Sequence, residues 1–523
     1  MPSTRSLASF AIILIATFIG LYRSLPAIFL SICPATSPLT CPTTNGHIHS
    51  GYFGYECAGN KPHHSSWTSW WHPQRSQGVA AEHKHGAGAI TNKWNILYHL
   101  GGNGPWVEKV IDVVDGGIAV PEGCHVQQVH MMSRHAERYP TRKAGYNQRA
   151  VVERMKKSGK TFNGTLAFFN DWELFWSSDD RLEQLTSTGP FSGTLGSFTT
   201  GVRLRTRYKH LLSDVLPDRP TRFWASDSQR VIETARHFAL GFFGIDYQDY
   251  NTADLEIIPE DSWREANTLT PGRTCLNNKR DLVEGQKKGY NLMGKYRATY
   301  LGPIRERLFA STGMDFSNQD VWAMQEMCGF ETTVRGHSDW CDVFTQHEFL
   351  AFEYARDVLH YYRAGPGQKY AASMGWLWLN ATTNLLLEGP KAGPLFFSFV
   401  HDGDIAPMMT ALGVINDAEH LPITHIAHDR KWRKSQVSPM GGRVILELLS
   451  CRIRDAPGPE KFVRLNINDG ITALPDCNSG PGRSCPLGQF VARTKRRGAE
   501  VGDFRELCGL GGNAKWKIEF LHQ

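Results

Sequence analysis

The sequence predicts an α/β fold in which a mostly parallel sheet is flanked by helices and carries an inserted α-helical cap domain. Three observations support this prediction. Strand-like and helix-like segments alternate from about Trp94 onward, three short apolar segments each end in polar residues just before a helix, and the periodicity is mainly helical over about 247–367. We therefore expect an α/β core over about 94–245 and 370–523, with a helical cap over about 246–369.

The length and composition indicate a folded protein that would suit a small anionic substrate. The chain has 523 residues, of which 41% are hydrophobic and 21% are charged, as is typical of globular proteins. The formal net charge is +6, but the basic residues are dispersed and form no nucleic-acid-binding motif, so no nucleic-acid partner is expected. A monomer and a homo-oligomer are both compatible with this composition.

Residues 1–34 are predicted to direct the chain into the secretory pathway. One arginine precedes an apolar run over residues 7–22, which is typical of a targeting signal. The run is slightly shorter than a membrane span, and no small-residue cleavage site follows it closely. Two alternatives follow: a cleaved signal peptide, which gives a secreted protein, and an uncleaved signal anchor, which tethers the protein to the membrane at the cell surface.

Residues 35–93 are expected to form an irregular N-terminal extension. They are rich in Ser, Thr, Gly, Pro, His and Trp and show neither helical nor alternating periodicity. The histidines of this segment lack the regular scaffold of a metal site, so a solvated tether is the preferred interpretation. The histidines concerned are His47, His49, His63, His64, His72, His83 and His85.

Two of the predicted core strands end in side chains suited to chemistry. Segment 126–132 is expected to be a strand that leads into Arg134 and His135. Segment 395–400 is a continuous apolar run typical of a buried strand, and it ends at residues 401–402. A helix is expected over 405–412, where Gly413 ends it.

A third short strand is expected at 222–225. Residues 226–228 are of capping types, and apolar residues then recur at helical spacing as far as Gly244. Arg230 lies at the start of this helix. In open α/β sheets, ligands bind at the carboxyl ends of strands, where helix N-termini also favour anions. The three strand ends therefore predict an anion-binding site.

A histidine between two arginines follows the first strand, in the segment Arg134-His135-Ala136-Glu137-Arg138. The guanidinium fork of arginine matches the oxygens of a phosphate group. Cations on both sides of an imidazole suppress its protonation and keep its lone pair free to attack in acid. His135 is therefore predicted to be a nucleophile, with a basic surface loop as the alternative interpretation.

His401 and Asp402 add a phosphate ligand and a carboxylic acid at the end of the second strand. A leaving alkoxide needs a nearby proton donor, and Asp402 is the candidate. The same pair would also serve to cap the following helix, which is compatible with catalysis. Glu137 and Asp404 place further carboxylates near the two motifs, which favours small monoesters as substrates over highly anionic ones.

These motifs together resemble the histidine acid phosphatases, specifically the fungal secreted acid phosphatases and phytases. The resemblance runs from about Tyr98 to Cys508 and implies one histidine acid phosphatase domain over 94–523, with a phosphoglycerate-mutase-like core. It also implies metal-independent hydrolysis of phosphate monoesters, phytate among them, without a cofactor. The matching segments are 98–106, 230–238, 364–369, 401–405 and 439–444.

The resemblance also implies a role for each matching residue. His135 is expected to be the nucleophile that becomes phosphohistidine, and Asp402 the acid that protonates the leaving group. The mechanism implied is two in-line displacements on a small phosphorylated substrate, with arginines supplying the charge that a metal ion supplies elsewhere. The expected phosphate cradle consists of Arg134, Arg138, Arg230 and His401.

The eleven cysteines and two sequons fit a protein exported through an oxidising compartment. The sequence has no Cys-x-x-Cys pair, so its cysteines do not resemble a zinc site, and sequence alone permits many pairings of them. Asn163 and Asn380 begin the sequons. The resemblance implies the pairs Cys124–Cys451, Cys275–Cys508, Cys328–Cys341 and Cys477–Cys485, together with Cys41–Cys57.

One residue departs from the family pattern. The family usually has glycine at the position of Ala136, directly after the nucleophile. If φ is positive there, the methyl group costs about 1 kcal/mol and would displace His135. A catalytically weakened or inactive cell-surface protein on a phosphatase fold is therefore one alternative. A phosphoglycerate-mutase-like enzyme is another, which the targeting segment and the cysteines oppose.

Overall fold

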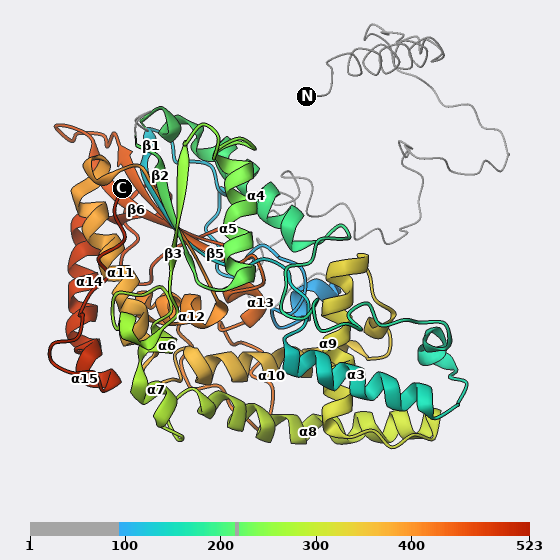
Figure 1. Cartoon of the computed structure of the whole chain (residues 1–523). Helices are drawn as coiled ribbons and strands as arrows, with labels where there is room; N and C mark the ends of the chain where they lie inside the picture. The colour runs from blue at the N-terminus through green and yellow to red at the C-terminus, as the bar shows by residue number, and fades with distance from the viewer. Residues whose placement is uncertain (1–93, 215–218) are drawn as a thin grey trace, which may run out of the picture. The chain divides into compact units, whose positions relative to one another are not determined.

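A mixed sheet forms the centre of the computed structural model, which describes residues 94–214 and 219–523 (Figure 1). The sheet has eight strands in the order β3-β2-β4-β1-β5-β6-β7, and β8 pairs with β6. The strands are β1 Cys124–Arg134, β2 Thr221–Ser226, β3 Ala253–Ile258, β4 Leu395–Val400, β5 Arg443–Cys451, β6 Glu460–Ile467, β7 Gly470–Thr472 and β8 Cys485–Pro486.

The strands that carry the predicted site form the parallel half of the sheet. β4 lies between β1 and β2 and is parallel to both, and β3 is parallel to β2. From β1 outward, β5 and the remaining strands pair in antiparallel fashion. The predicted α/β class with flanking helices is confirmed, whereas the expected mostly parallel sheet is corrected to a mixed one. β5 runs antiparallel to β1, and short connections then join β5, β6 and β7 as antiparallel neighbours.

The three predicted strands are present at the expected positions. β1 extends the predicted segment by two residues at each end, and β2 extends its segment by one residue at each end. β4 coincides with the continuous apolar run, and all six of its residues are buried. An uninterrupted apolar sequence is what a strand requires when helices cover both faces of the sheet.

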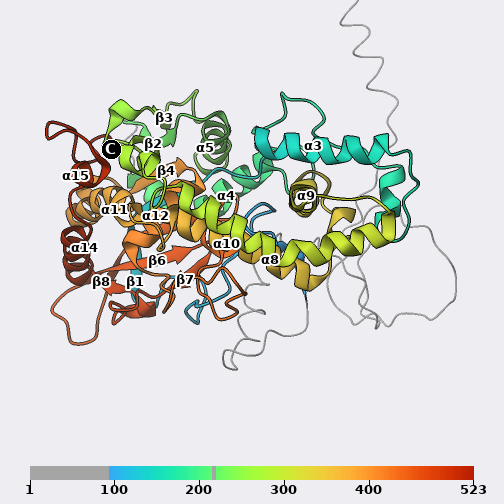
Figure 2. The same cartoon turned by 90° about the horizontal axis from the view of Figure 1, so that it is seen from below.

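Helices cover the sheet and also form a group beyond it (Figures 1 and 2). The helices are α3 Arg142–Lys157, α4 Gly193–Tyr208, α5 Gln229–Phe242, α6 Pro271–Thr274, α7 Leu276–Arg280, α8 Lys287–Thr312, α9 Asn318–Arg335, α10 Gln346–Ala364, α11 Ala371–Glu388, α12 Asp402–Leu412, α13 Lys434–Val437, α14 Leu487–Val501 and α15 Phe504–Cys508. The 3-10 helices are η3 Ile96–His99, η4 Gly164–Asn170, η5 Lys209–Asp214, η6 Ser262–Arg264, η7 Asp339–Cys341, η8 Gly389–Ala392 and η9 Pro481–Arg483.

The arrangement of these helices can be compared with the predicted cap. The boundaries of the cap stay a prediction. α3, α8 and α9 group together away from the strands in both views, and α10 packs against both α8 and α12. α3 belongs to this group although it precedes the predicted cap segment in sequence. β3 lies within the predicted cap segment yet joins the sheet beside β2.

Local sequence explains where the helices next to the site begin and end. α10 begins with a capping box, in which Thr345 and Glu348 each accept a main-chain N–H of the other. α12 ends at Gly413, whose φ of 61° suits a residue without a Cβ atom. α5 begins after Ser228 as expected, but the Ser228 side chain makes no capping hydrogen bond, which corrects the role predicted for it.

Four disulfides are present in the described chain, and the first two of them join segments that are distant in sequence. They are Cys124–Cys451, Cys275–Cys508, Cys328–Cys341 and Cys477–Cys485, the same pairs that the resemblance implied. The first links β1 to β5 at the edge opposite the predicted site. The expected Cys41–Cys57 pair, the histidines of the extension and the targeting segment all lie outside the described residues. Over 94–214 and 219–523, no helix is long and apolar enough to span a membrane.

Candidate active site

The carboxyl ends of β1, β4 and β2 bring the predicted site residues together. Arg134 pairs with Val400 across β1 and β4, so the next residue of each strand, His135 and His401, lie side by side with ring centroids 5.7 Å apart. Arg230 in the first turn of α5 reaches the same point, with its Nη2 atom 3.4 Å from Nδ1 of His401. The sequence expectation that three strand ends build one site agrees with this geometry.

His135 is buried in a form suited to nucleophilic attack. His135 is 2% exposed, and its Nδ1 atom lies 2.9 Å from the carbonyl oxygen of Ala136. A carbonyl oxygen only accepts hydrogen bonds, so Nδ1 carries the proton and Nε2 keeps its lone pair. Burial, with Arg134 and Arg230 next, lowers the pKa of His135 well below 6.5 and keeps the ring neutral in acid.

Three guanidiniums around His135 retain unused hydrogen-bond donors. Arg134 donates from Nη1 to the carbonyl oxygens of Gly102 and Ser438, at 3.0 and 2.9 Å. Arg138 donates from Nη1 to its neighbour's carbonyl oxygen. Within the described chain, the buried Nε atoms of Arg134, Arg138 and Arg230 have no hydrogen-bond partner. Buried N–H groups without partners are costly unless a ligand accepts them, so this cluster is built to receive an anion.

Burial lowers the pKa of these guanidiniums without removing their charge in acid. The pKa of Arg134 falls to about 10 and that of Arg138 to about 9, with burial as the largest cause and neighbouring cations adding to it for Arg138. Both values lie far above the acid range. The site therefore presents a fixed positive charge to a phosphate group.

His401 is oriented by a carboxylate that the sequence did not reveal. Its Nε2 atom lies 2.7 Å from Oε1 of Glu260, so this nitrogen donates to the carboxylate and Nδ1 faces Arg230. Burial lowers the pKa of His401, although the hydrogen bond to Glu260 opposes the shift. Glu260 follows β3, two residues beyond its end, and β3 was not among the predicted strands.

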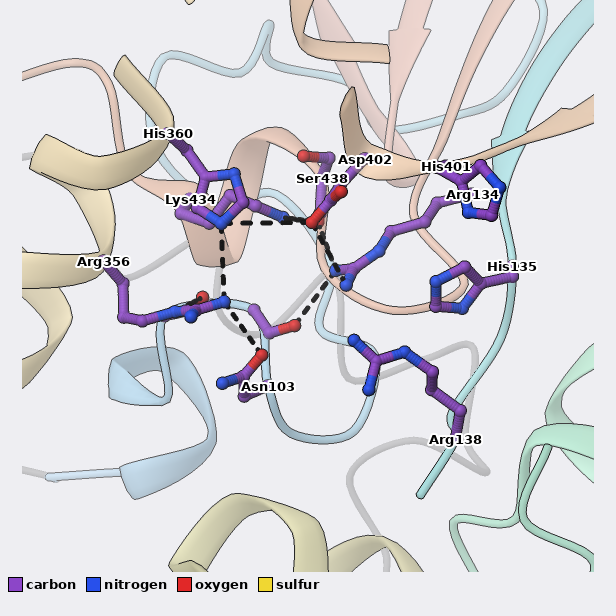
Figure 3. A network of polar contacts seen from close by, with 12 residues as sticks. Asn103, Arg134, His135, Arg138, Arg356, His360, His401, Asp402, Lys434 and Ser438 are labelled. Carbon is purple, nitrogen blue, oxygen red and sulfur yellow. Dashed lines mark hydrogen bonds and ion pairs between the residues drawn. The ribbon is translucent and has the colours of Figure 1, made fainter. Parts of the chain in front are cut away.

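Asp402 is surrounded by cations at the first position of α12 (Figure 3). Its Oδ2 atom lies 3.3 Å from Arg134 Nη2 and 3.5 Å from Lys434 Nζ, and its Oδ1 atom lies 3.9 Å from Arg363 Nη1. Burial alone would raise the pKa of Asp402, but these cations, Arg134 foremost, bring it well below 3.8. The carboxylate is therefore ionised in the free protein.

Several residues of this site escaped the sequence reasoning. Asn103 lies within the matching segment 98–106, but no role was predicted for it. The others sit on elements remote in sequence, and only the folded arrangement brings them to Asp402. They are His360, Arg356 and Arg363 on α10, Lys434 on α13, and Ser438 after it.

The backbone at Ala136 removes the predicted strain. Ala136 is not one of the described non-glycine residues that have a positive φ. Its N–H donates to Oγ1 of Thr234 at 3.0 Å, and it is fully buried. A methyl group is tolerated at a negative φ, so the feature that favoured an inactive homologue does not apply to this chain.

Two carboxylates near the motifs have structural partners. Glu137 accepts the Trp106 N–H at 2.7 Å, and burial raises its pKa to about 7. Asp404 accepts the His401 N–H at 3.1 Å, and burial raises its pKa well above 3.8. Asp404, and not Asp402, thus caps the start of α12. Both groups are engaged with the main chain, so they give no support to the predicted preference for small monoesters.

The described chain contains no group of three His, Cys, Asp or Glu side chains placed to hold a metal ion. The two sequons differ in their surroundings. Asn163 is exposed at the start of η4, whereas Asn380 is half-buried within α11 and Thr382 of its sequon is fully buried. Glycosylation at both positions stays a prediction, and the first offers the more accessible side chain.

Comparison with known proteins gives one consistent answer. Residues 125–468 match the model of the histidine phosphatase superfamily, branch 2. Phytase PHO112 of Candida albicans is 34% identical over 442 residues, which cover 83% of this chain and 91% of the relative. Acid phosphatase PHO1 of Komagataella pastoris is 34% identical over 437 residues, with 82% and 89% covered.

A solved structure agrees with these relatives. The crystal structure of the phytase from D. castellii superposes with a TM-score of 0.75 at 30% sequence identity, covering 85% of this chain and 94% of that one. The matched region contains His135, the arginine cluster and the His401-Asp402 pair. The chain therefore belongs to branch 2 of the histidine phosphatase superfamily, alongside fungal acid phosphatases and phytases.

Proposed function

We propose that this chain is an acid phosphatase that hydrolyses phosphate monoesters through a phosphohistidine intermediate on His135. The observation that carries the proposal is the neutral imidazole of His135, with its Nε2 lone pair free, among three guanidiniums whose buried Nε donors have no partner within the described chain. An imidazole lone pair is a nucleophile, and the donors suit the oxygens of the transferring phosphoryl group. The family and its named acid phosphatase and phytase relatives support the same reaction.

In the first step, Nε2 of His135 attacks phosphorus and the ester P–O bond breaks. The leaving oxygen takes a proton from Asp402, so an alcohol departs and the phosphoryl group stays on the imidazole. Arg134, Arg138 and Arg230 neutralise the phosphoryl oxygens as charge shifts between them, and His401, the fourth residue of the expected cradle, lies against Arg230 through its Nδ1 atom. Fixed arginine charges fill the role that a metal ion has in other phosphoryl-transfer enzymes, so the proposal includes metal independence.

In the second step, water attacks the phosphohistidine on the opposite side and the N–P bond breaks. Asp402, now ionised, takes the proton from this water, which restores its acidic form and releases inorganic phosphate. The low pKa of Asp402 in the free protein is compatible with its role as an acid. A bound phosphate adds negative charge beside Asp402 and engages Arg134, and both effects raise the pKa of the carboxyl group.

The proposal extends to substrates and to location. Phosphate monoesters in general, with phytate among them, are the proposed substrates, in line with the phytase relative. We further propose that the chain acts outside the cell or at its surface. Four disulfides support passage through an oxidising compartment.

The direct test is hydrolysis of p-nitrophenyl phosphate in acid, with EDTA present, by the wild-type chain and by His135→Ala. We expect full wild-type activity with the chelator and loss of nearly all activity in the variant. His237→Ala is the matched control, because His237 is a half-buried histidine on α5 whose contacts with Glu233 lie within its own helix. Loss of activity on chelation, or substantial activity in His135→Ala, would refute the proposed mechanism.

A second variant tests the acid. Asp402→Asn should slow the hydrolysis of alkyl phosphates far more than that of p-nitrophenyl phosphate, because p-nitrophenolate leaves readily without a proton. The two substrates should be compared at the same pH. An equal loss for both substrates would remove Asp402 from the role of proton donor.

A further inference from the structure

We propose that Lys434 is a positioning residue for Asp402. Lys434 holds the Asp402 carboxylate beside the leaving group and sets the pH range in which Asp402 carries the catalytic proton. This inference rests on the proposed function, in which Asp402 is the general acid. It assigns a role to a residue that the sequence motifs left out.

Lys434 is fully buried and contacts few polar groups. Its side chain has no solvent exposure, and its Nζ atom donates to the Ser438 carbonyl oxygen and lies 3.5 Å from Oδ2 of Asp402. Its main-chain N–H donates to Oδ1 of Asp357 on α10, at 2.6 Å, which fixes the start of α13. A buried ammonium is retained only where partners compensate for lost hydration. Those partners here include the proposed catalytic acid.

The glycine-rich segment before β1 is shaped around this lysine. Gly102 has a φ of 75°, and a Cβ atom there would lie 3.0 Å from Nζ and 3.2 Å from Cγ of Lys434. The Gly102 carbonyl oxygen also accepts a hydrogen bond from Arg134. This glycine therefore leaves room for the lysine and orients a phosphate-binding arginine at the same time.

His360 closes the other side of the cluster without adding charge. Its Nε2 atom lies 3.4 Å from Nη2 of Arg356, which can only donate, so Nε2 accepts and is unprotonated. The pKa of His360 lies well below 6.5, in agreement with a neutral ring. Burial is the largest cause of this shift, and the charge of Lys434 is the next. Arg356 is in turn held by Asn103 and the Gly101 carbonyl oxygen. Figure 3 shows His360, Lys434 and Arg134 converging on Asp402.

The charges that face Asp402 come from β1, α10 and α13. Arg134 is on β1, and Arg363 and the neutral His360 are on α10. Lys434 differs from Arg134, because a bound phosphate would engage Arg134 whereas the lysine is committed to Ser438 and Asp402. The remaining titratable or charged groups close enough to interact are His401, Asp404, Arg138 and Arg230.

The ammonium group of Lys434 acts on Asp402. Burial, with Arg134 next, lowers the pKa of Lys434 well below 10.5, and Asp402 opposes this shift. From 3.5 Å away, Lys434 lowers the pKa of the Asp402 carboxyl group, second among the cations to Arg134. Because kcat/KM reports the pKa of groups in the free enzyme, Lys434 should limit how far activity extends toward higher pH.

The test measures kcat/KM against pH for an alkyl phosphate, with wild type and Lys434→Met, which keeps the side-chain volume and removes the charge. We expect the alkaline limb of the profile to move to higher pH by about 1 to 3 pH units. Lys109→Met is the matched control, because Lys109 is another buried lysine, and it donates to the Ile111 carbonyl oxygen away from Asp402. This control should leave the limb in place. Should Lys434→Met not fold, Lys434→Gln replaces it, since glutamine retains a donor for Ser438.

A double variant separates this inference from the proposed function. In the Asp402→Asn background, where the carboxyl group no longer titrates, Lys434→Met should leave the profile of the residual rate unchanged. A limb that Lys434→Met does not move, or one that it moves equally in the Asp402→Asn background, overturns the role of Lys434. Either result would leave the proposed function standing if His135→Ala is inactive and Asp402→Asn affects alkyl phosphates selectively.

Discussion

At the scale of single residues, the site separates groups that carry chemistry from groups that hold the backbone. His135, Asp402 and the three arginines present free lone pairs, charge or unpartnered donors. Glu137, two residues after the nucleophile, instead accepts a main-chain N–H and is 4% exposed. Burial raises its pKa from 4.5 to about 7, which makes it a reporter of stability in acid.

The raised pKa of Glu137 predicts a specific pH dependence of stability. A carboxyl group with a higher pKa in the folded state binds its proton more tightly there, so its contribution is fully present below 4.5 and is lost as the pH rises through about 7. Glu137→Gln should remove this dependence, which is worth on the order of 1–3 kcal/mol. Urea unfolding at several pH values, relative to the exposed Glu173→Gln as control, should show a flatter dependence for Glu137→Gln. Parallel curves for both variants would contradict the assignment.

Ala136 yields a second prediction at this scale. Because its φ is not positive, Ala136→Gly should gain nothing in activity and should destabilise the chain by about 0.5–1 kcal/mol through backbone entropy. Thermal unfolding and hydrolysis of p-nitrophenyl phosphate check the two parts. A large rise in activity would mean that the methyl group displaces His135 after all.

The residues that the sequence predicted and those it missed differ in kind. His135, Arg134 and His401-Asp402 stand in short motifs at strand ends, where position and chemistry point to the same site. Lys434 and Glu260 reach the site only because their elements pack there, and nothing in their local sequence distinguishes them from solvated charges. The backbone angle of Ala136 was likewise a property of the folded chain.

At the scale of elements, α5 holds Arg230 in place through its close contact with α4. Gly201 on α4 and Gly241 on α5 each face the main chain of the other helix, and a Cβ atom at Gly241 would collide with the Phe198 carbonyl oxygen. α5 also packs Phe238 against Phe397 and Phe399 of β4. The helix is thus fixed between α4 and the sheet.

Gly241→Ala should therefore disturb both stability and the site. Forcing α4 and α5 apart should cost about 1–3 kcal/mol and lower activity by shifting Arg230. The matched control is Gly294→Ala on α8, where a Cβ atom would meet open space and a stabilisation of about 0.4–1 kcal/mol is expected. Denaturant unfolding and activity measure both variants. Equal stability of the two would show that the helix contact is looser than the structure indicates.

The predictability of elements followed the strength of their local signals. Segment 395–400 became β4 without change, because six consecutive apolar residues suit a strand buried on both faces. α10 lies within the segment 247–367 that was expected to be mainly helical, and its apolar positions recur at helical spacing over a long stretch. β3 was missed because it is an edge strand with a mixed burial pattern and no apolar run.

At the scale of the whole molecule, the two halves of the sheet have different roles. The parallel half presents three strand ends to one site, as open α/β sheets do. The antiparallel half extends the core, and the Cys124–Cys451 disulfide ties its first strand to β1. Alternation of segments in sequence predicted the α/β class, but it could not reveal strand direction after β5, which depends on pairing between strands.

The central claim is that the phosphoryl group passes through His135. Wild type and His135→Ala are mixed with substrate and quenched within a turnover in alkaline denaturant, which preserves a phosphoramidate bond, and peptides are then analysed by mass spectrometry. We expect one added phosphoryl group on the peptide that contains His135, and none on the corresponding peptide of His135→Ala. Steady turnover without any phosphorylated peptide, or a phosphoryl group on another residue, would contradict it.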